Sequence, residues 1–299
     1  NEVSGTITTY EISTPTTFDL TILHNNDGES ALLAEDEGGA YYGCISHFKS
    51  AVDSLKEKAM EAGDAVVMLS SGDNFLAGKE FNASKENGVY YDAIGLDSIG
   101  YDAICLGNHD FDFGPKVLAD FINTIQENQA PYLSSNIDFS GEADLQALVS
   151  NGRIAKRTVF EKGGRKIGVI GATTENLKSI SSPGNVTLSD VKTAIMAEVN
   201  AIKDTVDIII VISHLQSVEE DKALAAQLSH VDVMIAGGGD EVLASPLAEL
   251  HPDDTRKGEY PIIVKDSDSK EVPIVTTGGS YKYVGKLVVS FDANGDLVN

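Results

Sequence analysis

The stretch YDAICLGNHDFD, residues 101 to 112, decides how the rest of the sequence is interpreted. Its first six residues form an apolar run of strand length, and Gly107 follows where the chain can turn sharply. Asn108, His109 and Asp110 then stand side by side. The start of a helix explains one such polar residue but hardly all three. The stretch therefore predicts a strand that ends in a functional loop.

Apolar runs of strand length alternate with helical patterns along the whole chain. The helical patterns cover 44–63, 88–100, 115–129, 187–205 and 217–229. The runs that predict strands are 18–24, 65–70, 101–106, 132–137, 153–160, 165–173, 207–213, 231–237, 260–266, 272–277 and 285–292. Such alternation predicts an α/β domain with a predominantly parallel sheet, and the strand-rich tail predicts some antiparallel pairing.

The composition limits which partners the protein can have. The chain has 299 residues, of which 42% are hydrophobic, enough for a sizeable core. Its 46 Asp and Glu against 22 Lys and Arg give a formal charge of -24. Such a surface repels nucleic acid polymers and anionic membranes, and no apolar run reaches the roughly 18 residues of a membrane span. A small anionic substrate would need local positive charge, which bound cations can supply.

Polar residues follow five of the predicted strands. They are NNDGES (25–30), SSGDNF (70–75), GNHDFD (107–112), SHLQ (213–216) and GGGDE (237–241). Because ligands of open α/β sheets bind beyond the carboxyl ends of strands, these fragments are expected to converge. Oxygen and imidazole donors that converge suit a divalent metal site, and one bridging carboxylate can hold two ions about 3.5–4 Å apart. Each fragment alone is explained as well by a turn. The prediction therefore depends on the occurrence of five such fragments in order, each at a strand end.

These fragments resemble the signature of the calcineurin-like metallophosphoesterases, and specifically the N-terminal catalytic domain of the secreted 5'-nucleotidase group. That signature reads D-x-H, G-D, G-N-H-D/E, a lone His after a strand, and G-H-x-H. The resemblance covers roughly residues 18 to 292. It implies an α/β fold: a four-layer α/β/β/α sandwich with two mixed β-sheets.

The resemblance also implies two divalent metal ions and a ligand at each matching position. Asp27 would bind the first ion, and Asp73 would bridge both ions. Asn108 and His214 would bind the second ion.

A second group of residues is implied to act on the substrate. His109 would be a histidine that binds no metal and donates a proton to the phosphate or to the leaving-group oxygen, with Asn108 beside it in the substrate site. Asp112, three residues further on, would orient His109 and keep it protonated. Both of these catalytic positions match the family.

The chain departs from the family at three metal positions. Glu29 replaces the His of the first motif, and Gly238 and Asp240 replace both His residues of the last motif. The first site would then hold four carboxylates, those of Asp27, Glu29, Asp73 and Asp240. Oxygen-only ligation favours Mn, Mg or Ca, with Zn and Fe left open. Since glycine has no side chain to ligate with, we expect the second site to be weaker, or completed by water, a backbone carbonyl or another residue.

Two functions follow from these residues. The first is 5'-nucleotidase-like hydrolysis of phosphomonoesters by in-line attack of a metal-bound hydroxide, with nucleotides and cyclic phosphodiesters as open substrates. The alternative is a catalytically degenerate metal-binding domain with a regulatory or binding role, which the loss of three histidines supports. The matching His109 and Asp112 favour catalysis.

The expected domain organisation also rests on the resemblance. We expect residues 1–17 to be an N-terminal extension and residues 18–299 to form one catalytic domain. The C-terminal nucleotide-binding domain of the family is expected to be absent from this chain. An opening rich in Thr and Ser, without an initiator Met, is typical of an extracellular or periplasmic protein.

Overall fold

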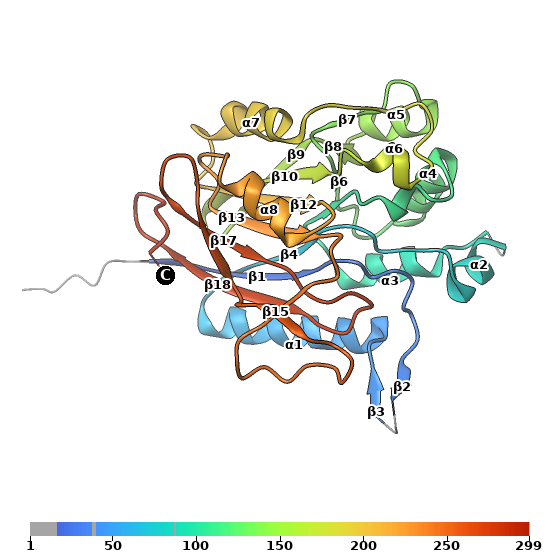
Figure 1. Ribbon diagram of the computed structural model, residues 1–299, viewed down its shortest axis with the longest axis horizontal. Helices are drawn as coiled ribbons and strands as arrows, with labels where there is room; N and C mark the ends of the chain where they lie inside the picture. Colours follow the sequence, from blue (N-terminus) through green and yellow to red (C-terminus); the bar gives the residue numbers. More distant parts are fainter. Residues whose placement is uncertain (1–16, 38–39, 87, 299) are drawn as a thin grey trace, which may run out of the picture.

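Two six-stranded sheets pack face to face in the computed structural model, which describes residues 17–37, 40–86 and 88–298 (Figure 1). The expected N-terminal extension therefore lies, except for Thr17, outside the described residues. Helices cover the outer face of each sheet, and Figure 1 shows α1 (Ile45–Ala62) and α7 (Val191–Ile202) on opposite sides of the molecule. The predicted α/β fold with two mixed sheets is confirmed.

The first sheet is parallel except at one edge. Its order is β18 (Gly285–Phe291), β1 (Phe18–Asn25), β4 (Ala65–Ser70), β5 (Ala103–Cys105), β6 (Tyr132–Leu133) and β8 (Ile154–Ala155). Only β18 runs antiparallel to its neighbour, so the strand-rich tail returns to pair with the first strand. Side chains of β18 alternate between buried and more exposed positions, as expected for an edge strand.

The second sheet has a parallel centre and an antiparallel strand at each edge. Its order is β16 (Ile262–Lys265), β17 (Glu271–Val275), β13 (Val233–Gly237), β12 (Ile208–His214), β10 (Arg165–Thr173) and β9 (Arg157–Lys162). Every residue of β12 is buried, because a central parallel strand is covered on both faces. Its continuous apolar sequence is therefore explained by its place in the sheet.

The remaining elements are shorter or lie outside the sheets. The other helices are α2 (Lys79–Glu86), α3 (Tyr91–Ile99), η1 (His109–Phe111), α4 (Pro115–Thr124), α5 (Ala143–Ser150), α6 (Leu177–Ile180) and α8 (Val218–Ala225). The short strand pairs are β2 (Glu35–Glu37) with β3 (Ala40–Tyr42), β7 (Ile137–Asp138) with β11 (Thr187–Leu188), and β14 (Val242–Leu243) with β15 (Arg256–Gly258). None of the described helices is both long and apolar enough to cross a membrane.

The predicted strand at 132–137 is wrong in one respect, because it divides into β6 and β7, which belong to different sheets. The side chains between them make hydrogen bonds instead of continuing the first sheet. The Ser134 hydroxyl donates to Asn136 Oδ1 (3.1 Å), and Asn136 Nδ2 donates to the carbonyl of Thr173 in the second sheet (2.8 Å). Buried polar groups need such partners, so the chain turns toward the second sheet here.

Three buried clusters hold the layers together. One lies between the sheets and includes Ile22, Leu69 and Ile210, all fully buried. The other two join the outer face of each sheet to its helices. Both sheets are fixed by this packing, so the loops at their strand ends have a rigid base.

We predict that Ile210→Ala lowers the free energy of unfolding by about 2–5 kcal/mol, because it leaves a cavity between the sheets. Ile263→Ala is the matched control, since the Ile263 side chain on β16 is 51% exposed. The control should change stability by no more than about 0.5 kcal/mol. Urea unfolding of both variants checks this, and equal losses would contradict the assigned core.

Candidate metal centre

The loops after β1 and β4 run side by side at the carboxyl ends of their strands. The Asp27 N–H donates to the carbonyl of Gly72, and the Glu29 N–H donates to the carbonyl of Asp73, each at 3.0 Å. These bonds extend the pairing of the two strands into the loops. The acidic residues of the first two fragments are therefore placed together by backbone hydrogen bonds.

Asp27 lies at the point where the two sheets meet. Its Oδ2 accepts hydrogen bonds from Asn26 Nδ2 (2.6 Å) and from the backbone N–H of Gly238 (3.0 Å), which follows β13 of the second sheet. Its carbonyl accepts from the N–H of Ser280 (2.7 Å). The carboxylate is buried, and Oδ1 remains directed toward His214, whose Nε2 is 4.0 Å away.

His214 joins Asp27 and Asp73 in one buried group. His214 Nε2 is 2.8 Å from Asp73 Oδ2, and the ligand atoms of all three residues lie within 4.8 Å of one another. His214 Nδ1 donates to the carbonyl of Ser71 (2.6 Å). A histidine whose other nitrogen is held in this way has a fixed ring orientation, which is typical of metal-binding histidines.

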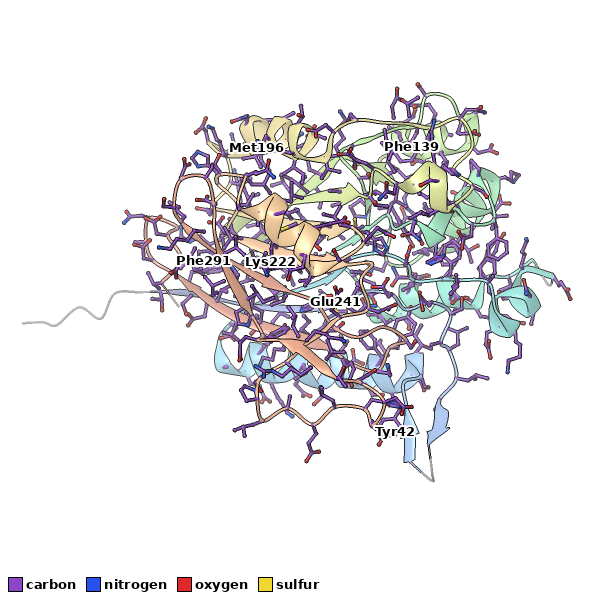
Figure 2. All side chains as sticks on the ribbon, in the orientation of Figure 1. Tyr42, Phe139, Met196, Lys222, Glu241 and Phe291 are labelled. Carbon is purple, nitrogen blue, oxygen red and sulfur yellow. The ribbon has the colours of Figure 1, made fainter. Side chains whose placement is uncertain are left out.

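Asp27 also belongs to a second group, with Glu29 and Asp240. The ligand atoms of these three carboxylates again lie within 4.8 Å of one another, although Glu29 is only half-buried and Asp240 is exposed. The loop that carries Asp240 is marked by the neighbouring Glu241, labelled near the centre of Figure 2. The predicted ligands of the first ion thus gather around Asp27.

Burial and mutual repulsion raise the pKa values of these carboxyl groups in the protein without bound ions. Burial raises the pKa of Asp27 to about 6; His214 opposes this rise and Asp73 adds to it. Burial also raises the pKa of Glu29 to about 7, with further increases from Asp27, Asp240 and Asp73. No ion pair among the described residues joins a Lys or Arg to these carboxylates.

His214 shows the converse effect. Burial lowers its pKa, but the carboxylates of Asp73 and Asp27 outweigh burial and raise the pKa to about 10. His214 would therefore have to lose this proton before Nε2 could bind a metal ion. Four carboxylates and one oriented imidazole, with no Lys or Arg paired to them among the described residues, form a donor set that fits divalent ions, with oxygen predominating.

Asn108 and His109 reach the centre through the loop after β5. The backbone N–H of His109 donates to Asp73 Oδ1 (2.8 Å), so the two oxygens of Asp73 face His109 and His214 respectively. Asn108 is buried, and its Oδ1 accepts from Gln216 Nε2 (3.1 Å). Gln216 is a residue that the sequence patterns did not assign, although it stands in the SHLQ fragment.

The predicted pair of His109 and Asp112 is present as a hydrogen-bonded chain. His109 Nδ1 donates to Asp112 Oδ2 (2.6 Å), and the Ser181 hydroxyl donates to Asp112 Oδ1 (2.8 Å). The His109 side chain is 33% exposed. Burial lowers its pKa, but Asp73 and the bond to Asp112 outweigh burial and raise it. This partly exposed histidine can therefore carry a second proton on Nε2.

Gly238 offers no side chain, and the backbone shows that none fits. Its φ is +84°, and a Cβ built there would overlap the carbonyl oxygen of Leu215 and lie 2.9 Å from His214 Nε2. Its N–H nevertheless serves the centre by donating to Asp27. Position 238 therefore contributes a backbone hydrogen bond to Asp27 and no side-chain ligand.

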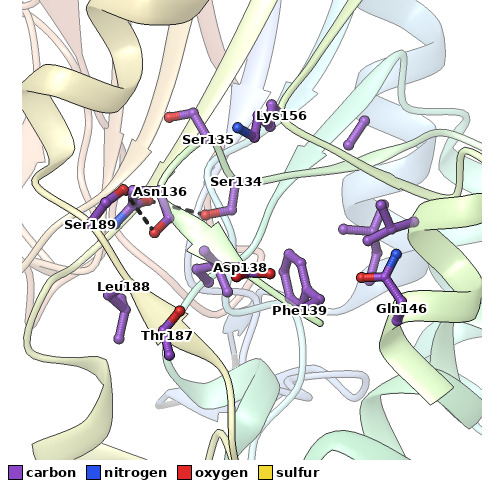
Figure 3. A pocket seen from close by; sticks show the side chains of 14 residues that line it. Ser134, Ser135, Asn136, Asp138, Phe139, Gln146, Lys156, Thr187, Leu188 and Ser189 are labelled. Atoms are coloured by element: carbon purple, nitrogen blue, oxygen red, sulfur yellow. Dashed lines mark hydrogen bonds between the residues drawn. The ribbon is translucent and has the colours of Figure 1, made fainter. Parts of the chain in front are cut away.

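A cavity of about 460 Å³ lies beside the carboxyl ends of β6 and β8 (Figure 3). Asn136, Asp138, Phe139 and Lys156 are among the residues that line it, and none of its lining residues is a predicted metal ligand. The Ser189 hydroxyl donates to the carbonyl of Asn136 at its edge (3.3 Å). This cavity is thus separate from the carboxylate centre.

Comparisons with known proteins agree with this geometry. The family model described as Calcineurin-like phosphoesterase matches residues 23–238. The chain belongs to the calcineurin-like phosphoesterase family. The matched region runs from the end of β1 to the loop after β13. It includes all of the predicted metal ligands except Asp240.

Apyrases and 5'-nucleotidases are among the relatives of this chain. An apyrase of Aedes aegypti is 32% identical over 94% of this chain and 50% of its own length, and a 5'-nucleotidase of Bos taurus is 32% identical over 94% and 48%. A solved 5'-nucleotidase precursor from Thermus thermophilus superposes with a TM-score of 0.82 at 31% identity, over 94% of this chain and 53% of that one. The chain spans about half the length of the curated relatives it matches.

Because the pKa of Glu29 is raised, we predict that the stability of the phosphoesterase domain depends on pH when a chelator is present. Its folded-state pKa of about 7 exceeds the ordinary value of 4.5, so the native state binds more protons between these values. Stability should therefore fall as pH rises from about 5 to about 8. Glu29→Gln should lessen this fall and raise the Tm by a few degrees at pH 8.

The matched control for this prediction is Glu219→Gln, whose side chain is 75% exposed on α8. It should follow the wild-type pH profile. Adding Mn²⁺ at pH 8 should reverse the order, since the wild type then gains a ligand that Glu29→Gln lacks. Parallel thermal profiles of the wild type and Glu29→Gln in the chelator would contradict the assigned repulsion.

A histidine introduced at position 238 should destabilise the protein. The free energy of unfolding of Gly238→His should be about 1–3 kcal/mol lower than that of Gly152→His, because only Gly238 lacks room for a side chain. Gly152 is the matched control, since the two positions have similar φ values, +84° and +80°. Urea unfolding measures this difference. A stable Gly238→His variant that binds Zn²⁺ more tightly than the wild type would show that the loop can rearrange.

Proposed function

We propose that this domain is a metal-dependent phosphoester hydrolase that acts on phosphomonoesters, with nucleotides as the first substrate class. The observation that carries the proposal is the hydrogen-bonded chain of His109, Asp112 and Ser181 beside the carboxylate centre. Metal binding alone does not require a partly exposed histidine whose Nδ1 proton is held by a carboxylate. The similarity to apyrases and 5'-nucleotidases supports the nucleotide class.

Each group has a defined task in this reaction. Divalent ions held by Asp27, Glu29, Asp73 and Asp240, and by Asn108 and His214, supply Lewis acidity toward water and the phosphoryl group when bound. The chain's own residues move the proton. His109 faces the substrate with Nε2 and donates to the leaving-group oxygen, while Asp112 stabilises the charged ring and fixes its orientation through Nδ1.

The position of Asp73 links the two parts of the site. One of its oxygens faces the His214 ring, and the other accepts from the backbone of His109. A change in Asp73 should therefore disturb both ion binding and the placement of His109. Asp112 lies outside the carboxylate centre, so its effect should be confined to proton transfer.

We also propose an extracellular or periplasmic location, supported by the resemblance to the secreted 5'-nucleotidase group. Cyclic phosphodiesters form a second substrate class for the same site. The alternative, a metal-binding domain without turnover, is favoured by one observation: Gly238 supplies no side chain to the second ion.

The test measures hydrolysis of 4-nitrophenyl phosphate, its diester and a nucleoside 5'-monophosphate after chelation and reloading with Mn²⁺, Mg²⁺, Ca²⁺ or Zn²⁺. We predict that His109→Ala lowers kcat by about 10²–10⁴-fold without changing the number of bound ions. Asp73→Asn should instead lose bound ions, because Asp73 is the proposed bridge between the two ions and its Oδ2 lies 2.8 Å from His214 Nε2.

The control is His47→Ala, an exposed histidine on α1 that belongs to neither group of close ligand atoms and should retain full activity. Absence of turnover by the wild type with every ion would reject the hydrolase and leave the metal-binding alternative. Loss of ions in His109→Ala would show that this histidine is a ligand and that its assigned role is wrong.

A further inference from the structure

The second ion lacks a ligand if only the residues predicted from sequence are counted. Asp73, Asn108 and His214 provide three side chains, and position 238 provides none. Hard divalent ions such as Mn²⁺ and Mg²⁺ prefer about six donors, mostly oxygen. Water can fill several of these places, but a protein group next to Asn108 and His214 would determine whether the site is occupied at all.

Gln216 lies where such a group is needed. It is half-buried and comes two residues after His214, directly beyond the end of β12. Its terminal amide is 3.1 Å from Asn108 Oδ1, the atom that would bind the second ion, and 3.2 Å from the carbonyl oxygen of Leu215. That same carbonyl is the atom that a Cβ at Gly238 would strike. The amide of Gln216 therefore occupies the neighbourhood that a side chain at position 238 would enter.

We propose that Gln216 supplies the missing ligand of the second ion through its side-chain oxygen, an assignment that rests on the two-ion site of the proposed function. In the structure, the Gln216 amide nitrogen donates to Asn108 Oδ1. The oxygen and nitrogen of a carboxamide have nearly the same size, so a half-turn about the last side-chain bond exchanges them. Asn108 and Gln216 then present two amide oxygens to one ion.

This assignment explains the pattern of substitutions around the second ion. A histidine at position 238 would add a nitrogen ligand, whereas Gln216 adds a neutral oxygen. The second site then contains Asp73, Asn108 and Gln216 as oxygen donors with His214 as its one predicted nitrogen donor. Both ions would have predominantly oxygen ligands, so the two sites would share a preference for Mn²⁺ or Mg²⁺ over Zn²⁺.

A different role for Gln216 makes the opposite prediction for one variant. Gln216 could act only as a donor that holds Asn108 in place, because an amide oxygen has two lone pairs and can accept a hydrogen bond while it binds an ion. Glutamate cannot donate to Asn108 but is a good oxygen ligand. Gln216→Glu therefore separates a ligand from a positioning donor, and Gln216→Leu removes both capacities.

The experiment titrates the full chain, freed of metal by chelation, with Mn²⁺ alone. Binding is followed by calorimetry and by electron paramagnetic resonance, which detects coupling between two neighbouring Mn²⁺ ions. We expect two ions in the wild type. In Gln216→Leu the second ion should bind at least about 10-fold more weakly while the first is unchanged. Gln216→Glu should bind the second ion at least as tightly as the wild type and restore the coupled signal.

Gln227→Leu is the control, because Gln227 is an exposed glutamine just beyond α8 that donates to Ala223, and it should bind both ions as the wild type does. Circular dichroism confirms that each variant is folded. Unchanged binding in Gln216→Leu, weak binding in Gln216→Glu, or a single ion in the wild type would each overturn the proposal. The titration uses no substrate, so the Gln216 variants decide this assignment even where hydrolysis is absent, a result that would reject the proposed function alone.

Discussion

The structure of this centre depends on the crowding of negative charge at one point where two sheets meet. Asp27 shares one group of close ligand atoms with Asp73 and His214 and another with Glu29 and Asp240. Burial makes each charge costly, and repulsion among the carboxylates adds to that cost. A divalent ion is the simplest group that removes the cost, since no described Lys or Arg pairs with these residues.

The backbone of the strand-end loops adopts unusual conformations at the acidic residues of the centre. Four acidic residues of the centre, Asp27, Glu29, Asp73 and Asp240, have left-handed φ values of 50°, 48°, 53° and 52°. Such conformations cost roughly 1–3 kcal/mol each in a residue other than glycine and persist only where the surroundings impose them. Here the two packed sheets and the hydrogen bonds between the loops impose them. The rigid core thus allows the loops to aim their carboxylates toward one point.

Much of this arrangement could be predicted from sequence, because strand periodicity and strand-end residues are local patterns. The run 207–213 predicts a buried strand, and His214 follows at its end in the structure. The role of Gln216 could not be predicted, since it depends on a contact with Asn108, which follows a strand of the other sheet. The steric closure at Gly238 could not be predicted either, because the blocking atom is the carbonyl of Leu215. Neither contact has a signature in the spacing of residues.

The three lost histidines are therefore better explained as one coordinated change than as independent decay. Two of them became carboxylates whose oxygens now lie close to Asp27. The third became a glycine whose N–H holds Asp27 and whose missing side chain leaves room beside the Leu215 carbonyl and the amide of Gln216. Independent decay would more often leave inert side chains at such positions. Positions 29 and 240 instead carry oxygen in place of nitrogen, which is the exchange that a harder metal ion requires.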